Sequence, residues 1–378
     1  MRKFILKAFI VKKLSILAAA LVLIGLGFCA YSGNNSSKDD KGRPTVKIGV
    51  IAPLSGDNAL MGQNCLKGIQ FALENIKDSK VDYKLIVEDD ANQLANAAKI
   101  ANKLTNIDNV DVLFSCSSNS GSAAVTYSKN NKRFMITVIA SAKEIAAESP
   151  YSFLHWTSPE KESEKALEIF KKNDVKKVVV FEIIHGGAET LSDALTKILG
   201  ENGIDSARYK FQMGERNFND IVLKASREDA DVFMILALPP SIDIIVKTLK
   251  QKGIETPYTS MEIPTLIEDR AAFEGVEFVD VTDGELEVID NYKKKFNTEN
   301  TYGVAFAYDA IMIINKMINE FFMDNSRIPN SEEMTEKLLN MKEHFGAVGK
   351  VTVNPNRMLS SEAVIKKIIN GKPITVEN

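Results

Sequence analysis

Polar residues that could hold charged groups follow three of the short apolar runs in this chain. The turn from Ser117 to Ser122 offers hydroxyls, an amide and backbone N–H groups just before a predicted helix, where the helix dipole favours an anion. Ser141 adds a hydroxyl, and Glu262 ends a short predicted strand, where a carboxylate invites a cationic partner. Ordinary roles compete, because Ser and Asn before a helix commonly cap it and a lone Glu is commonly a solvated surface residue.

No catalytic motif accompanies these residues. The chain has no G-x-S-x-G, P-loop, H-E-x-x-H or Cys-x-x-Cys pattern, and it contains only three His and three Cys. We therefore expect neither an enzyme nor a bound metal or cofactor. The 47 basic and 50 acidic residues give a net charge of −3, and no long basic run is present, so we expect no nucleic-acid partner.

The cysteines leave one question open. Cys65 and Cys116 have a spacing that suits no metal motif, and the sequence does not decide whether they pair. Cys65 lies among apolar positions of a predicted helix, and Cys116 follows a predicted strand. We interpret both as buried free thiols.

The elements that must position these residues alternate regularly from Thr45 onward. Short apolar runs such as 46–52, 112–115 and 134–138 predict strands, and amphipathic segments such as 63–77 predict helices. The same alternation restarts after Trp156 and continues to a short strand at 258–260. It predicts an α/β fold of right-handed βαβ units with mainly parallel sheets, and the length fits two such sheets better than one.

The N-terminus predicts export. Five basic residues between Arg2 and Lys13 precede an uncharged apolar run from Leu14 to Phe28, which fits a signal peptide better than a full membrane span. Residues 1–29 are therefore interpreted as a signal or lipid-anchor segment, although an uncleaved anchor is an alternative. Residues 30–44, rich in Ser, Asn, Asp, Lys and Gly, predict a flexible tether.

Cys29, at the end of the apolar run and before this tether, resembles the lipidated cysteine of a bacterial lipoprotein. Phe28 departs from the small residue that normally precedes that cysteine. We interpret Cys29 as the lipidation site, and cleavage after Ser32 is the alternative.

An ordered set of segments resembles the type I periplasmic binding proteins, in the branch that binds leucine, isoleucine and valine or related amino acids. The resemblance covers essentially everything from Thr45 onward. The segments, in chain order, are 46–56, Gly62 and Gly68, Asp89-Asp90, Asn217-Phe218, 305–310 and 346–350.

This resemblance implies two doubly wound parallel-sheet lobes joined by three crossovers, which we expect near Trp156, Val281 and Phe345. The first lobe would comprise residues 45–156 and 283–344, and the second 157–282 and 345–378. His155 and Trp156 would then serve as hinge residues rather than ligand contacts.

The resemblance also implies the binding residues. The family's carboxylate-binding serine falls on Asn119, in the turn that includes Ser118. Its second turn falls on Ile139, Ala140 and Ser141, where the Ile139 carbonyl would face an ammonium group. The acidic residue that pairs with that ammonium falls on Glu262.

Three positions depart from the family pattern. An aromatic residue of the first loop is replaced by Met61, and two ligand-facing tyrosines are replaced by Gly187 and Ala237. Losing these rings predicts a larger pocket or a different ligand side chain, unless neighbours such as Phe181, Leu238 or Trp156 fill the space.

These features together predict an exported solute-binding protein of an ABC importer. It would capture an amino acid or a related zwitterion by hinge closure, deliver it to permease and ATPase subunits, and be held at the membrane by lipid or by its N-terminal segment. The alternatives are a receptor or sensor ectodomain and a ligand-free envelope regulator of the same fold.

Overall fold

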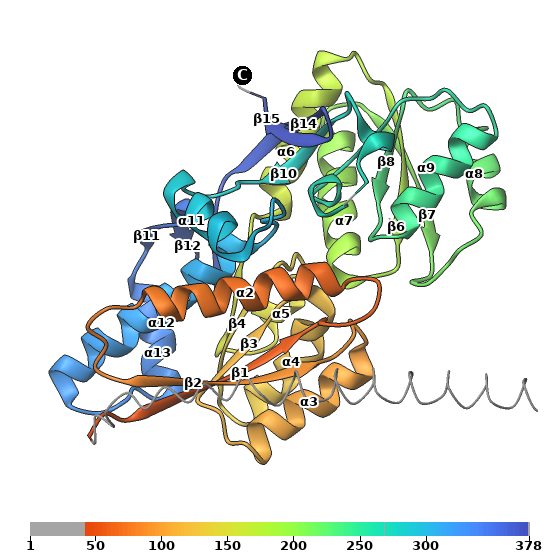
Figure 1. Cartoon of the computed structure of the whole chain (residues 1–378). Coiled ribbons are helices and arrows are strands. Elements are labelled where there is room, and N and C mark those ends of the chain that lie inside the picture. Colours follow the sequence, from red (N-terminus) through yellow and green to blue (C-terminus); the bar gives the residue numbers. More distant parts are fainter. Residues whose placement is uncertain (1–41, 268, 377–378) are drawn as a thin grey trace, which may run out of the picture. The chain divides into compact units, whose positions relative to one another are not determined.

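The computed structural model describes residues 42–267 and 269–376. The predicted signal segment, Cys29 and most of the predicted tether lie outside these residues. Within them, two α/β lobes are each built on their own sheet (Figure 1). None of the helices in this part of the chain is long and apolar enough to cross a membrane.

The first lobe is built on an eight-stranded sheet with the order β11-β12-β13-β5-β4-β3-β1-β2. Strands β1 to β5 and β13 run parallel, whereas β12 is antiparallel to both of its neighbours. The strands are β1 (Thr45–Ala52), β2 (Asp82–Asp89), β3 (Val112–Ser115), β4 (Phe134–Val138), β5 (Ser152–His155), β11 (Glu343–Gly346), β12 (Gly349–Val353) and β13 (Met358–Ser360).

Helices cover both faces of this sheet, because its central strands are apolar on both sides. One face packs against α2 (Ala59–Asn75), α11 (Leu286–Phe296), α12 (Val304–Asn325) and α13 (Ser331–Asn340). The other face packs against α3 (Leu94–Asn106), α4 (Ser118–Asn130) and α5 (Glu144–Ala147). In β1, for example, Val50 joins the first core and Ile51 the second.

The second lobe has a four-stranded parallel sheet in the order β7-β6-β8-β9 and an antiparallel sheet in the order β10-β14-β15. Its strands are β6 (Lys177–Ile183), β7 (Asp205–Phe211), β8 (Val232–Leu236), β9 (Tyr258–Ser260), β10 (Glu277–Val281), β14 (Ala363–Ile369) and β15 (Lys372–Thr375). Its helices are α6 (Pro159–Lys172), α7 (Gly186–Glu201), α8 (Asn219–Ala225), α9 (Ser241–Gln251), α10 (Ile263–Leu266) and the 3-10 turn η1 (Ala271–Phe273).

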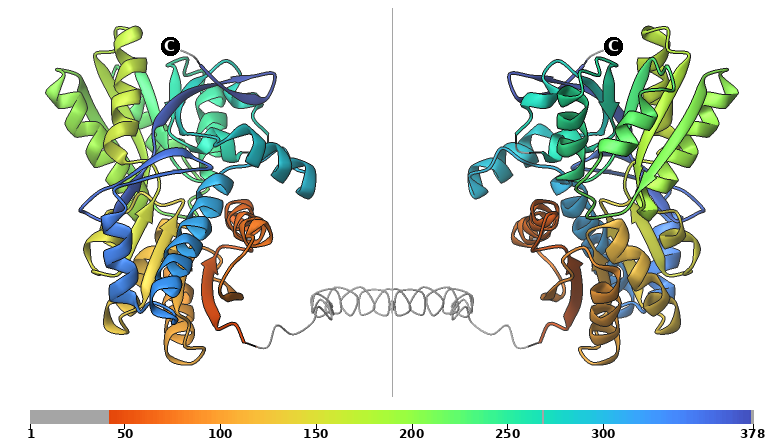
Figure 2. Two further views of the ribbon diagram at one scale, coloured as in Figure 1. Left: turned by 90° about the vertical axis from the view of Figure 1, so that its left-hand side faces the viewer. Right: turned by 90° about the vertical axis from the view of Figure 1, so that its right-hand side faces the viewer.

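The chain crosses between the lobes three times, and the third crossover differs from the sequence-based expectation. The first two crossovers follow β5 and β10, close to Trp156 and Val281. The segment after Phe345 does not enter the second lobe directly, because β13 pairs in parallel with β5 of the first sheet. The third crossover therefore follows Ser360, and only β14 and β15 join the second lobe (Figure 1 and Figure 2).

Cys65 and Cys116 form a disulfide, so the interpretation as free thiols was wrong. Cys65 lies on the buried face of α2, and Cys116 directly follows β3. Their Cα atoms are 6.1 Å apart because α2 packs across the end of β3, although 51 residues separate them in the sequence. Disulfides of this kind persist in oxidising compartments outside the cytoplasm.

Candidate ligand-binding site

A small cavity of about 60 Å³ lies where the carboxyl ends of strands from both lobes meet, which is where open α/β sheets bind ligands. Its walls come from the segments that follow β3 and β4 in the first lobe and β6, β8 and β9 in the second, together with α2, α7 and Tyr302. The lining residues are Met61, Ser117, Ser118, Ile139, Ala140, Ser141, Ile183, His185, Gly187, Ala188, Leu191, Leu236, Ala237, Leu238, Glu262, Ile263 and Tyr302.

All the predicted binding residues except Asn119 line this cavity. The side chain of Asn119 is committed elsewhere, because its Nδ2 atom donates a hydrogen bond of 3.0 Å to the Asn92 carbonyl oxygen. Ser117, which precedes α4, lines the cavity instead. The family resemblance thus pointed to a turn that borders the cavity. Side-chain hydrogen bonds determine which residues of that turn face the cavity.

Two helix N-termini meet at one end of the cavity. Helix α4 begins at Ser118, and α7 of the second lobe begins at Gly186. A Cβ atom on Gly187 would lie 2.7 Å from Ser118 Oγ, so a larger residue here would require the serine side chain to move. The Ser118 hydroxyl also accepts a hydrogen bond from Ser141 N at 3.2 Å. Converging helix N-termini and hydroxyls favour a negatively charged group at this end.

His185 lies at the same end and is uncharged at neutral pH. Burial lowers its pKa to about 4, and its Nε2 atom is buried without a hydrogen-bond partner among the described residues. A neutral imidazole can donate or accept one hydrogen bond at that atom, depending on its tautomer.

Ile139 adopts a backbone conformation that a β-branched residue rarely takes. It follows β4 with φ of +56°. It is the only β-branched residue with positive φ in the described part of the chain, and such strain concentrates at ligand sites.

Glu262 faces the cavity from the second lobe in a similarly strained position. Its φ of 63° and ψ of −46°, with a hydrogen bond of 2.7 Å from Ile263 N to the Met261 carbonyl oxygen, make it the centre of a γ-turn of the rare positive-φ type. Its own N–H donates to the Val279 carbonyl oxygen at 2.7 Å. The backbone is therefore fixed on both sides of this residue.

Two aromatic donors hold the Glu262 carboxylate. Trp156 Nε1 donates to Oε1 at 2.6 Å, and the Tyr302 hydroxyl donates to Oε2 at 2.9 Å. Burial, followed by the charge of Glu262, raises the pKa of Tyr302, which keeps this hydroxyl a neutral donor. Both donors come from the first lobe, Trp156 from the segment after β5 and Tyr302 from the segment before α12, so this carboxylate is a contact between the lobes.

The cavity is therefore polar at two ends and apolar between them. Helix N-termini and hydroxyls form one end, and the Glu262 carboxylate forms the other. The remaining wall is aliphatic and comes mainly from the second lobe; its members are Ile183, Ala188, Leu191, Leu236, Leu238 and Ile263.

Sequence reasoning missed several of these residues. Tyr302 immediately precedes a segment used for the family resemblance, but no local pattern shows that its hydroxyl reaches Glu262. Of the three residues proposed to replace the lost rings, Leu238 lines the cavity. Trp156 does not line the cavity but donates a hydrogen bond to Glu262, and Phe181 packs in the second core against Phe233.

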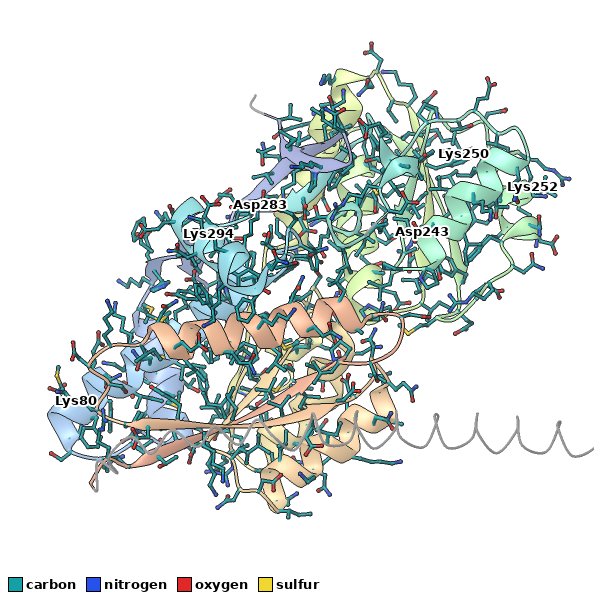
Figure 3. All side chains as sticks on the ribbon, viewed as in Figure 1. Lys80, Asp243, Lys250, Lys252, Asp283 and Lys294 are labelled. Atoms are coloured by element: carbon teal, nitrogen blue, oxygen red, sulfur yellow. A yellow bond between two sulfur atoms is a disulfide. The ribbon has the colours of Figure 1, made fainter. Side chains whose placement is uncertain are left out.

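A larger cavity of about 1010 Å³ lies on the other side of Met61, the one residue that lines both. Its wall is strongly charged and includes Asp243 and Lys250 of α9, both labelled in Figure 3. Met61 thus lies between the small cavity and a wide one whose wall includes several charged side chains.

Comparisons with known proteins agree with this architecture. The periplasmic binding protein family profile matches residues 45–371. An amino acid binding protein from Pseudomonas aeruginosa is 24% identical over 224 residues, which are 57% of this chain and 60% of that relative's length. The chain therefore matches less than two thirds of that protein.

Two solved structures share the fold. A leucine-binding protein from Thermotoga maritima, 22% identical, superimposes with a TM-score of 0.81 over 88% of this chain and 98% of that one. A solute-binding protein of an ABC transporter from Rhodopseudomonas palustris, solved with p-hydroxybenzoic acid and 19% identical, gives 0.77 over 88% and 96%.

Proteins of this family bind solutes and are not enzymes, and the family implies a location outside the cytoplasm. With the profile matched over nearly all of the described residues, the chain belongs to the periplasmic binding protein family, with the fold of its type I members of the branched-chain amino acid kind.

Proposed function

We propose that this protein captures a free α-amino acid with an apolar side chain and delivers it to the permease and ATPase subunits of an ABC importer. The position of Glu262 carries this proposal. A buried carboxylate opposite two helix N-termini matches the two charges of an amino acid zwitterion. The ligand carboxylate would lie near Ser118 and Ser141, and its ammonium would lie between Glu262 and the Ile139 carbonyl.

The wall between these ends supports an apolar side chain. It carries aliphatic groups, and burying them against a ligand side chain contributes roughly 25 cal/mol per Å². The cavity of about 60 Å³ is smaller than most ligand sites, which enclose roughly 300–1,000 Å³. We therefore propose that the lobes open to admit the ligand and close over it, through the three crossovers.

Aromatic carboxylates are the competing ligand class, since structural neighbours bind them. Such a ligand has a carboxylate but no ammonium, so it would leave Glu262 buried without a cation. An unpaired carboxylate next to an apolar ring costs several kcal/mol, whereas an ammonium removes that cost. This difference favours the amino acid.

A thermal-shift screen tests the proposal. The purified protein would be mixed with the standard amino acids, short peptides, polyamines and benzoates. A ligand at 100 times its Kd should raise the free energy of unfolding by about 2.7 kcal/mol, which the screen detects. We expect hits among amino acids with aliphatic side chains.

Glu262→Gln should greatly weaken these hits, because the amide keeps the shape of the side chain but loses its charge. Glu255→Gln, at an exposed site in the same lobe, is the matched control and should bind as the wild type does. Equal binding by the Glu262 variant, or hits confined to benzoates, would contradict the proposal.

A further inference from the structure

A second buried carboxyl group lies behind Glu262. Glu162 is in the first half of α6, and its side chain is completely buried. Neither of its carboxyl oxygens receives a hydrogen bond from a donor among the described residues. A fully buried carboxylate that neither a donor nor a cation satisfies is strongly disfavoured, so Glu162 is satisfied only if it carries a proton.

The charges around Glu162 offer no other way to neutralise it. The largest effects of nearby charges on it come from Glu262, from Asp280 on β10 and from Glu160 on its own helix, and all three are negative. The buried base on β14, Lys366, is engaged by Asp280 at 2.9 Å and by Asp283 at 2.6 Å.

The remaining element packed against α6 is α7, and its charged side chains are paired elsewhere. Glu189 bonds to Lys210, Asp193 bonds to Arg208, and Lys197 lies 4.0 Å from Glu201. The donors Trp156 and Tyr302 reach Glu262 rather than Glu162. A proton is thus the one available counter-charge for Glu162 in the described structure.

We propose that Glu162 carries a proton in the folded protein, and that this proton competes with the cationic group of the ligand at this end of the cavity. Burial, followed by the charge of Glu262, raises the pKa of Glu162 well above its ordinary value, which agrees with this geometry. Glu162 is then a positioning residue: it stays neutral and leaves Glu262 as the carboxylate that faces the cavity.

This competition between proton and ligand follows from Coulomb's law. It rests on the proposed function, in which the ligand carries an ammonium group. An ammonium next to Glu262 removes part of the repulsion that holds the proton on Glu162. Binding therefore releases some of that proton to solvent, and by reciprocity a rise in pH strengthens binding.

The first test needs no ligand. A carboxyl group with a raised pKa in the folded state keeps a proton that the unfolded chain loses above about pH 4.3, so stability falls as pH rises. Between pH 5 and 9, the free energy of unfolding of the wild type should fall relative to that of Glu162→Gln. The slope of this difference against pH should correspond to up to one proton per molecule. Glu164→Gln, an exposed change on the same helix, should keep the wild-type slope.

If Glu162→Gln does not fold, Glu162→Met serves in its place and should change the slope in the same way, because it also removes the carboxyl group. Identical slopes in wild type and variant would overturn the protonated Glu162, whether or not any amino acid binds.

The second test uses the amino acid found in the screen. Calorimetry in buffers of different ionisation enthalpy should show proton release by the wild type and affinity that rises with pH. Glu162→Gln should bind without releasing a proton and without that pH dependence. Binding by the wild type with no proton release would overturn the competition, whereas a screen without amino acid hits would contradict only the proposed function.

Discussion

At the scale of single residues, Glu262 is held by two neutral donors rather than by a cation. Trp156 and Tyr302 satisfy its oxygens from the first lobe, and neither brings a positive charge. Its charge thus remains available to a ligand. A salt bridge to arginine would have satisfied the same oxygens but cancelled that charge.

Removing the Tyr302 hydroxyl should therefore weaken both binding and folding. A hydrogen bond to a charged group contributes about 1.5–3 kcal/mol, so Tyr302→Phe should lower ligand affinity at least several-fold and reduce the free energy of unfolding. Tyr292→Phe is the matched control, because the Tyr292 hydroxyl is buried without a partner among the described residues. Calorimetry and urea unfolding measure both effects, and equal losses in the two variants would contradict the role of Tyr302.

Sequence reasoning nominated Glu262, which lines the cavity, but it did not predict the surroundings of this residue. A Glu at the end of a short strand, in register with a known family, was enough to nominate it. Its two donors lie far from it in the sequence, at Trp156 and Tyr302. No periodicity links them, and the buried Glu162 reads as one more charged residue of an amphipathic helix. Contacts between residues so far apart in the sequence are determined by how the two lobes pack together.

At the scale of elements, the disulfide fixes α2 against the end of β3. Helix α2 follows the loop that leads to Met61, so this link also restrains one wall of the cavity. Sequence reasoning predicted the helix and the strand but not the bond between them, because cysteine pairing depends on how the two elements pack.

Loss of this disulfide should destabilise the protein. In the chain-entropy model, a loop of this length contributes about 4 kcal/mol, and measured values are typically about 2–4 kcal/mol. The double variant Cys65→Ala/Cys116→Ala should lose a comparable free energy of unfolding in urea and become insensitive to reductant. Alkylation of both residues in the unfolded, unreduced wild type would show that the bond does not form.

The element boundaries show where sequence patterns succeed. The strands 112–115, 134–138 and 258–260 were predicted to the residue. The first two are short apolar runs bounded by polar turns, whereas 258–260, with the sequence Tyr-Thr-Ser, continues the alternation of strands and helices in the second lobe. The third crossover was misplaced because β13 is a three-residue strand whose position is set by pairing with β5. Short edge additions of this kind leave little pattern in the sequence.

At the scale of the whole molecule, polar contacts join the lobes beside the cavity. Arg216 Nη2 of the second lobe lies 2.6 Å from Asp57 Oδ2 of the first. Nearby, Asn58 Nδ2 donates to the Pro239 carbonyl oxygen at 3.4 Å. Such contacts exist only while the lobes are together, so they favour the closed arrangement.

Breaking the Arg216 contact should shift the equilibrium toward the open form. Exposed ion pairs contribute about 0.2–1 kcal/mol, so Arg216→Ala should weaken ligand binding by no more than about five-fold, with most of the effect lost at high salt. Arg227→Ala changes an exposed arginine of the same lobe and should leave affinity unchanged. Tighter binding by the Arg216 variant would show that the contact opposes closure.

The pairing of a ligand ammonium with Glu262 is tested most directly by comparing leucine with 4-methylpentanoate, which has the same carboxylate and side chain but no ammonium. Breaking a buried hydrogen-bonded charge pair costs about 2–5 kcal/mol, so calorimetry should show leucine binding at least about 30-fold more tightly. In Glu262→Gln this preference should largely disappear. Equal or tighter binding of 4-methylpentanoate by the wild type would contradict the zwitterion site and assign the cavity to simple carboxylates.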